Sequence, residues 1–531
     1  MKKLLFATIA FGLPAVMAAQ SATDIYSLSQ TDIRGTARFM SMGGAFTALG
    51  GDLSTLTQNP AGIGVYRRSE IGATLDISPQ SVSATTNTNK NKISSTTVAC
   101  NNFGYIGTVR LNGAMQTFSW GASYNRLTSF DRKVSAYSGS TSTSLSNYIA
   151  SFSYGTPYSA MEFNSNTNYN PYFDSDADWL SILAYSAYMI NPTGGSSYTG
   201  LFQNGTQGDA MTEMRESGYV DEYAIDFGGN VGDVVMWGIG FGITDLKYNR
   251  QAYYSESMSN AYVATADGRM VTGDAGFDLN NYRHINGNGF NFKLGLIFKP
   301  INDLRIGVAF HTPTWYSMSS AGYGEVDYSY YNPAAQQGRD NPFTGYDYTE
   351  DSYYNFHMTA PWRFMIGVAG VLGSSAIVSV DYECQAYNKM RTSYQGSFND
   401  YVSNDWVNSD IDQYYKAANI LRVGAEFRVT PSFSVRAGYN YTSTTASSYA
   451  LDGGEVLTAG TDPSYTLDRG VNAISVGLGY RYKAFYIDGA YVYRNKKSTY
   501  KAYTNFDGYT SPSADLTQVT NSIVLSAGFK F

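Results

Sequence analysis

The sequence predicts an all-β protein: a 14-stranded antiparallel transmembrane β-barrel with an N-terminal plug, or hatch, inside the lumen. Three observations lead to this fold class. The chain starts with a predicted export signal, and no later apolar run is long enough for a membrane-spanning helix. Apolar and polar residues then alternate in many short segments, and the connections between these segments are short and long in turn.

The export signal is a secretory signal peptide, predicted for residues 1–19. A basic start precedes an apolar run from Leu4 to Val16, and Ala18 and Ala19 are the small residues expected at a cleavage site. The run is too short to cross a bilayer ~30 Å thick as a helix. Such a chain is expected to be periplasmic, secreted or an outer-membrane barrel, and we predict the bacterial outer membrane.

The alternation is the signature of barrel strands, in which one face meets lipid and the other meets the lumen. One face of a single segment carries Phe290, Phe292, Leu294, Leu296 and Phe298. A soluble sandwich would show the same period with the apolar face inward, so periodicity alone leaves both folds open. The candidate strands are 69–79, 100–111, 116–129, 219–230, 234–249, 287–299, 303–316, 362–371, 374–388, 419–429, 432–443, 471–482, 485–495 and 519–531.

The connections favour the barrel. Short connections are expected at 112–113, 231–233, 300–302, 372–373, 430–431 and 483–484, and long ones at 80–99, 130–218, 250–286, 317–361, 389–418, 444–470 and 496–518. Short periplasmic turns and long extracellular loops produce this rhythm. Because so many strands enclose a wide lumen, we expect residues 20–68 to form a plug and residues 69–531 to form the barrel, with 130–218 as its longest loop.

Composition excludes several classes of function. The net charge is −7 and 15% of residues are charged, so no cationic field points to nucleic acid. Aromatic residues make up 15%, which suits β structure at an interface. Two cysteines, Cys100 and Cys384, rule out a disulfide scaffold, although one disulfide between them stays open. No catalytic motif is recognisable, and we expect no enzyme activity and no cofactor.

The predicted plug carries the family signal. Gly43-Gly44-Ala45-Phe46 and the later stretch Leu56-Thr57-Gln58-Asn59-Pro60-Ala61-Gly62 resemble the N-terminal hatch of the FadL / OmpP1 / TodX family of outer-membrane transport proteins. Ile306 to Thr314, Pro361 to Phe364 with Ile377 to Glu383, and Leu421 to Phe427 with Val435 to Tyr439 resemble later hairpins of that family, in the same order. The similarity extends over most of the chain.

The resemblance implies passive transport of hydrophobic compounds such as long-chain fatty acids, captured at extracellular loops and passed through a plugged barrel. A structural barrel or adhesin displaying Tyr-rich loops, or a hemin-binding receptor, remains an alternative. The expected partners are hydrophobic small molecules, outer-membrane lipids and lipopolysaccharide, and the expected state is a monomer. The hatch residues expected to meet ligand are Phe39, Met42, Phe46, Asn59, Pro60 and Ala61.

A second candidate ligand site lies in the longest predicted loop. Apolar residues recur there at roughly helical spacing after three alternating acids, which would favour a helix N-terminus. They form either a helix packed on its own loop or an exposed apolar groove that catches ligand. The residues are Trp179, Leu180, Leu183, Ala187 and Ile190, and the acids are Asp174, Asp176 and Asp178, which lack the pattern of a calcium loop.

No metal site is expected, because His284, His311 and His357 lie far apart in the sequence. The polar faces of the candidate strands carry charges that should point into the lumen, where they pair with one another or hold a substrate carboxylate. These residues are Arg110, Asp226, Lys293, Arg305, Asp381, Arg422, Glu426, Arg428, Arg436 and Arg481.

Overall fold

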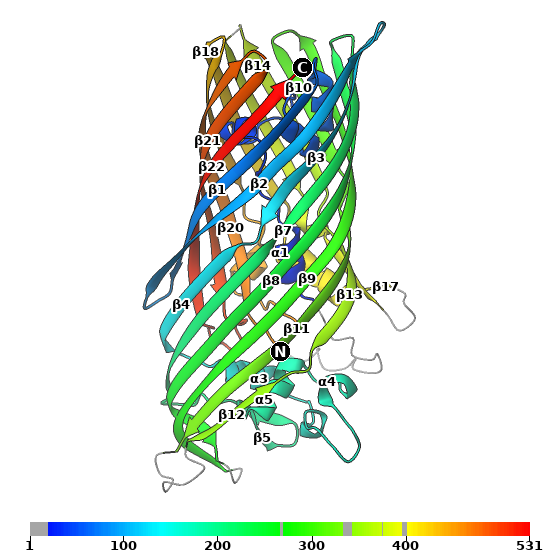
Figure 1. Cartoon of the computed structure of the whole chain (residues 1–531). Coiled ribbons are helices and arrows are strands. Elements are labelled where there is room, and N and C mark those ends of the chain that lie inside the picture. Colours follow the sequence, from blue (N-terminus) through cyan, green and yellow to red (C-terminus); the bar gives the residue numbers. More distant parts are fainter. Residues whose placement is uncertain (1–19, 266–268, 333–341, 374, 396–400) are drawn as a thin grey trace, which may run out of the picture.

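The chain forms a closed antiparallel barrel (Figure 1). The computed structural model describes residues 20–265, 269–332, 342–373, 375–395 and 401–531. The last strand pairs with the first, for example Leu525 with Leu75, so the sheet closes on itself. The predicted signal peptide, residues 1–19, lies outside the described residues.

Within the described residues, 14 strand positions surround the lumen, as the sequence predicts. Ten positions are single strands: β1 Glu70–Thr85, β2 Lys90–Arg110, β7 Gln207–Val231, β8 Val235–Ala264, β9 Met270–Ile301, β18 Ala418–Thr430, β19 Phe433–Thr442, β20 Tyr465–Tyr482, β21 Phe485–Lys501 and β22 Ser513–Lys530. Four are interrupted: β3 Met115–Ser129 with β4 Arg132–Thr141, β10 Leu304–His311 with β11 Trp315–Tyr331, β14 Arg363–Leu372 with β13 Ser352–Thr359, and β15 Ala376–Gln385 with β16 Arg391–Gln395.

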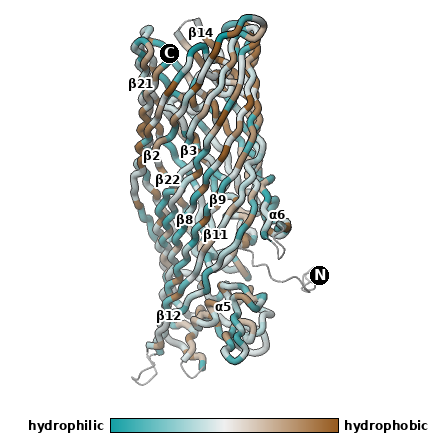
Figure 2. The backbone as a smooth tube through the Cα atoms, turned by 45° about the vertical axis from the view of Figure 1, so that its right-hand side comes forward, coloured by the Kyte–Doolittle hydropathy of each residue, from teal (hydrophilic) through white to brown (hydrophobic). Residues whose placement is uncertain are grey.

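An apolar belt surrounds the barrel on its outside. On β9, Phe290, Leu294 and Leu296 are 50%, 56% and 55% exposed, whereas the intervening Asn291 and Lys293 are buried in the lumen. Figure 2 shows the hydrophobic colours gathered in the half of the barrel that carries the short turns. So much exposed apolar surface is unfavourable in water, and it suits contact with lipid hydrocarbon.

Two of the expected long loops, 80–99 and 250–286, are wrong, because strands run through them. β1 and β2 leave only a short turn at 86–89, and β8 and β9 continue far past the belt. On β8 the outward face changes from Ile243 to Asp245 and Lys247, while Leu246 faces inward, so the apolar face switches from the outside to the inside. The backbone ladder continues regardless, since hydrogen bonding does not depend on which solvent the outer face meets.

The plug lies in the lumen and extends from the short-turn end to about the middle of the barrel (Figure 1). It consists of α1 Ala22–Ser29, α2 Ala37–Ser41 and the 3-10 turns η1 Leu53–Thr57 and η2 Pro60–Val65. Each begins at a side-chain cap, from Ser21, Thr36, Asp52 and Asn59 respectively. These caps stabilise elements too short to be helical alone.

Inward-facing glycines let the plug backbone lie directly against the wall. A Cβ at Gly307 would collide with the Thr47 carbonyl, and one at Gly438 would collide with Gly43. The lumen-facing side of the strands therefore carries glycine because a larger side chain would collide with the plug backbone. Charged groups complete the attachment: Arg38 donates to Glu426 at 2.8 Å, and the Thr47 amide donates to Asp381 at 2.7 Å.

The other end of the barrel is closed by a loop domain between β4 and β7. It contains α3 Leu145–Phe152, η3 Tyr158–Ala160, α4 Pro171–Asp174, α5 Trp179–Ser186, β5 Asn191–Gly194 and β6 Ser197–Thr199. Its core packs on inward residues of the strand extensions, such as Tyr254, Met258 and Phe277. The remaining elements are β12 Phe343–Tyr348, β17 Tyr401–Ser403, η4 Tyr387–Lys389, α6 Asp405–Tyr414, which packs on α1, and α7 Ser448–Leu451.

Glu256 attaches this loop domain to the extension of β8, well beyond the belt. Its carboxylate accepts from the Leu145 amide at 2.9 Å and from the Ser144 hydroxyl, and burial raises its pKa to about 7 from an ordinary 4.5. Because the pKa is raised, Glu256 stays protonated to a higher pH in the folded state than in the unfolded state. Its contribution to the free energy of unfolding is therefore full below pH 4.5 and is lost as the pH rises through about 7.

We therefore expect the loop domain to become easier to cleave between pH 5 and pH 8, because deprotonated Glu256 is costly to bury. Limited proteolysis across that range measures this effect. The variant Glu256→Gln should show a flat pH profile between these limits, and Glu213→Gln, on the outer face, should behave like the parent. An unchanged slope in Glu256→Gln would contradict the assignment.

Candidate functional site: a vestibule, a plug segment and a seam in the wall

The barrel wall has a seam between β2 and β4. β2 pairs with β3 only from Asn102 to Arg110, and beyond Asn102 its ladder is with β1 alone. β4 pairs with β7 on its other side. Side chains bridge the seam instead: Asn91 donates to Ser135 at 2.8 Å, and Thr86 donates to the Tyr137 carbonyl at 2.6 Å. Such isolated bonds contribute about 1 kcal/mol each, less than a continuous ladder.

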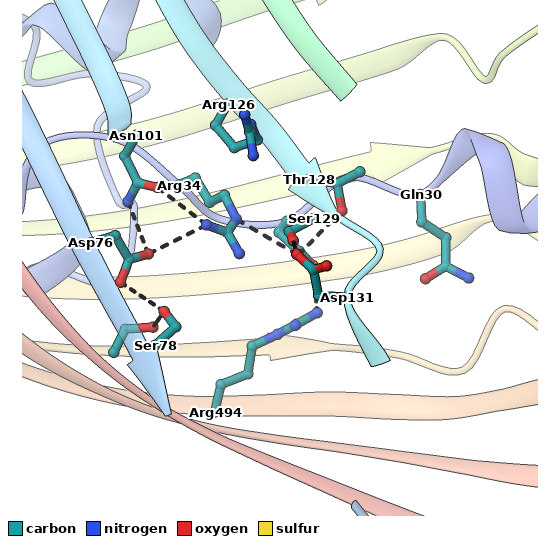
Figure 3. A network of polar contacts seen from close by, with 12 residues as sticks. Gln30, Arg34, Asp76, Ser78, Asn101, Arg126, Thr128, Ser129, Asp131 and Arg494 are labelled. Carbon is teal, nitrogen blue, oxygen red and sulfur yellow. Dashed lines mark hydrogen bonds and ion pairs between the residues drawn. The ribbon is translucent and has the colours of Figure 1, made fainter. Parts of the chain in front are cut away.

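The plug segment after α1 connects the two sides of the seam from within (Figure 3). On the β1–β2 side, the Arg34 guanidinium contacts Asp76 at 3.3 Å and Asn101 at 3.1 Å. On the β3 side, the Asp32 amide donates to the Leu127 carbonyl at 3.0 Å. The segment is therefore a staple: moving it releases both sides at once.

Asp32 is itself held in place by charge. Arg494 donates to its carboxylate at 2.6 Å, and the Thr128 hydroxyl donates at 3.2 Å. Burial alone raises the pKa of Asp32, but the charges of Arg494 and Arg34 outweigh it and keep the pKa below its ordinary value. Asp32 therefore stays ionised at neutral pH, and the staple is a permanent ionic contact there. A cavity of about 70 Å³ lies beside it, bounded by Gln30, Ser129 and other seam residues.

A vestibule of about 260 Å³ lies on the loop-domain side of the plug. Two aromatic residues, Trp179 of α5 and Tyr354 of β13, border it together with polar groups such as Ser320 and Ser352. A cavity of about 150 Å³ can already hold benzene. The vestibule can therefore accommodate a substituted aromatic compound.

The floor of the vestibule is an ion pair between the wall and the plug. Arg283 of β9 contacts Asp24 of α1 at 2.6 Å and donates to the Ala459 carbonyl at 3.1 Å. Burial by itself raises the pKa of Asp24, but Arg283 and the Ser21 hydrogen bonds hold it below its ordinary value. The floor is therefore ionised and closed at neutral pH. A small cavity that includes Ser27 and Arg132 lies below it.

The predicted hatch residues are placed in the plug but not around the vestibule. Phe39, Met42 and Phe46 belong to a buried cluster at the short-turn end. Asn59 caps η2 and donates to the Thr47 carbonyl at 2.6 Å, and Pro60 and Ala61 pack against the wall at Gly238. The structure gives these residues a packing role, and their contact with ligand stays a proposal.

The predicted loop residues are buried rather than arranged along an exposed groove. Leu180, Leu183, Ala187 and Ile190 lie in the core of the loop domain, at most 4% exposed. Trp179 is 5% exposed, and of the five it alone borders the vestibule. Of the two alternatives for this segment, a helix packed on its own loop fits this placement, because α5 is apolar on nearly every side.

The lumen charges mostly pair as expected. Arg422 contacts Glu383, and Glu426 accepts from Arg436 at 2.7 Å. Arg110, Arg428 and Arg481 are instead exposed at the turn end. The described residues contain no cluster of His, Cys, Asp or Glu fit for a metal ion, and Cys100 and Cys384 are free thiols. No helix among the described residues is long and apolar enough to cross a membrane.

Sequence reasoning missed the staple residues Asp32, Arg34, Asp76 and Asn101. Asn101 adjoins a register shift in the β1–β2 pairing that alternation cannot reveal. Asp76 could have been found, because a carboxylate on the lumen side of a predicted strand indicates a cationic partner inside the barrel. Arg34 and Arg38 are cations of the predicted plug that could serve as this partner, but the sequence does not show which of them contacts Asp76.

Comparison with known proteins supports the fold. No family model matches the chain, and no curated protein matches it in sequence. A FadL homologue from Pseudomonas aeruginosa aligns with a TM-score of 0.52 at 12% identity, over 94% of this chain and 99% of that chain. The toluene transporter TodX of P. putida aligns with a TM-score of 0.50 at 12% identity, over 94% and 99%. At this identity the likeness establishes a shared fold, as the resemblance in the sequence implied.

Proposed function

We propose that this chain is a passive outer-membrane channel for small hydrophobic compounds, which enter at the vestibule and leave sideways through the β2–β4 seam. The observation that carries the proposal is the staple, in which one plug segment holds both sides of an unpaired stretch of wall. A channel that opened only along its axis would not need such a segment behind a gap in its wall. The apolar belt and the shared fold support the membrane location.

Aromatic compounds are the proposed cargo, in preference to long-chain fatty acids. The vestibule is compact and is bordered by Trp179 and Tyr354, which suits a flat ring better than an extended acyl chain. One protein of the same fold is a toluene transporter, which supports an aromatic cargo. Burial of apolar area in the vestibule favours capture by ~25 cal/mol per Å².

Movement from the vestibule to the seam requires the plug to shift. The Arg283–Asp24 pair and the staple both attach to the segment 24–34, so displacement of α1 opens the floor and the seam together. No nucleotide or proton coupling is invoked, since the direction of flow follows the concentration of the cargo. A long-chain fatty acid, the alternative cargo, would take the same route from the vestibule to the seam.

Filling the vestibule tests the cargo. In intact Gram-negative cells that produce the full chain, uptake of labelled toluene and labelled palmitate is compared with cells that lack it. Ser352→Phe adds a ring to the vestibule wall and should slow toluene uptake about tenfold, as expected when overpacking closes a site. The matched control Ser317→Phe faces outward on β11 and should transport normally.

A faster uptake of palmitate than of toluene by the parent protein would replace the aromatic cargo with a fatty acid. Equal uptake of both compounds by producing and non-producing cells would contradict transport altogether.

A further inference from the structure

A groove of about 820 Å³ crosses the outer face of the barrel above the apolar belt. The belt ends at Ile243 on β8, Phe290 on β9 and Trp315 on β11. Polar residues such as Lys247 and Asn286, which are partners in register, separate it from the groove. The outward side chains that line it include Lys133, Arg215, Gln251, Tyr282, Tyr323 and Tyr353. The groove therefore lies outside the hydrocarbon layer.

One end of the groove is aromatic. Tyr282 and Tyr323 are cross-strand partners, and their rings stack at 4.7 Å between centroids. Gln251 donates to the Tyr282 hydroxyl at 3.3 Å, and that hydroxyl donates to Glu325 at 3.4 Å, so the ring is fixed. Tyr353 is 74% exposed nearby. These tyrosines are too far from the belt to act as its aromatic girdle, and an exposed cluster of flat rings marks a binding surface.

The centre of the groove offers neutral hydrogen-bonding groups. Asn249 and His284 are cross-strand partners joined at 2.6 Å, with Ser217 opposite Asn249 on β7. Ala321 is the aliphatic residue of the lining, so an acyl chain would find little apolar surface. Amides, a hydroxyl and an imidazole are suited to a ligand rich in hydroxyl groups.

The other end is cationic. Lys133 of β4 and Arg215 of β7 lie directly opposite each other in register and face outward. Among the described residues neither side chain has an ion-pair partner, and like charges at opposed positions destabilise a sheet. Asp131 also borders the groove, but its carboxylate accepts from Ser129. The two cations are therefore free to bind an anionic group.

We propose that this groove binds an anionic glycan. Sugar rings stack on Tyr282, Tyr323 and Tyr353, hydroxyls meet the central amides, and a phosphate or carboxylate is held by Lys133 and Arg215. The sugar is supplied by neighbouring outer-leaflet glycolipids or by free polysaccharide, which share this chemistry. The inference rests on the outer-membrane location proposed above, and it does not depend on which cargo is transported.

The test uses the purified full chain in detergent and deacylated core oligosaccharide from rough lipopolysaccharide, with and without its phosphates. We expect saturable binding of the phosphorylated form by calorimetry. Lys133→Ala/Arg215→Ala should weaken it about tenfold and leave the dephosphorylated form within about twofold. Tyr323→Ala should weaken both forms about fivefold, whereas Tyr323→Phe retains the ring and should bind like the parent. Lys497→Ala, an exposed cation on β21, is the matched control.

The amount of lipopolysaccharide that co-purifies identifies the source. A loss in the Lys133→Ala/Arg215→Ala variant supports a glycolipid, and an unchanged amount with weakened oligosaccharide binding supports a free polysaccharide. Absence of saturable binding to either oligosaccharide, or equal binding by the parent and both alanine variants, overturns the proposal. None of these results depends on whether toluene is transported.

Discussion

Replacing Arg34 with alanine is expected to open the seam and to raise uptake of hydrophobic cargo at least about tenfold. Arg34 contacts Asp76, which is 1% exposed, so its removal leaves a buried carboxylate without its cation. Breaking a buried pair in this way costs roughly 3 kcal/mol. Because 1.4 kcal/mol is a factor of ten in an equilibrium, even part of this cost shifts the closed state substantially toward the open one.

Two measurements check this expectation: the uptake rate, and the distance between spin labels at Thr96 and Lys133, which lie on opposite sides of the seam. The distance distribution should broaden and move to longer values. Arg67→Ala is the control, since Arg67 lies in the plug region but is 60% exposed and pairs at the rim with Asp233. Arg34→Ala/Asp76→Asn should fold better than the single variant and still leak. An unchanged distance in both variants would refute the staple.

Replacing Glu426 with alanine is expected to loosen the plug and to produce ion conductance. Glu426 accepts from Arg38 of the plug at 2.8 Å and from Arg436 of the wall at 2.7 Å. Without it, two buried guanidinium groups face each other with only Asp488 left to balance Arg436. We expect a loss of roughly 3–5 kcal/mol in plug attachment.

Planar bilayer recordings measure this effect. The parent should be nearly silent, whereas Glu426→Ala should show frequent large openings, because the lumen of so wide a barrel conducts once the plug leaves. Glu426→Gln keeps an acceptor and should fall between them. Glu213→Ala, on the outer face of β7, should remain silent. Silent recordings from Glu426→Ala would mean that the glycine contacts alone hold the plug.

The sequence predicted the barrel because its strongest signal, the alternation, is imposed by lipid on one side and lumen on the other. The prediction stopped where that cause stops: beyond Ile243, strand β8 continues with a polar outer face, and its apolar residues, such as Leu246 and Tyr248, face inward instead. Pro313 lies in the interruption between β10 and β11, and Pro361 lies in the interruption between β13 and β14, because proline cannot donate to the ladder. Next to these interruptions, Trp315 of β11 and Thr359 of β13 pair with each other.

The candidate site was less predictable for a different reason. Phe39, Met42 and Phe46 are apolar residues of the plug, and they pack in a buried cluster that holds the plug together. The groups that carry the proposed function are polar and distant in sequence: Arg34 meets Asp76, and Asp24 meets Arg283. Only the closure of the barrel brings such pairs together.

Locking the seam shows whether cargo leaves the barrel through its wall. Asn91→Cys and Ser135→Cys, whose parent side chains are hydrogen-bonded across the seam, are joined by a short reducible thiol crosslinker in a background with Cys100 and Cys384 replaced by serine. A control pair, Ser83→Cys with Thr517→Cys, joins partners in the continuous β1–β22 wall. We expect that crosslinking across the seam abolishes toluene uptake, that reduction restores it, and that the control pair transports in both states. Full uptake through a completely crosslinked seam would contradict this expectation.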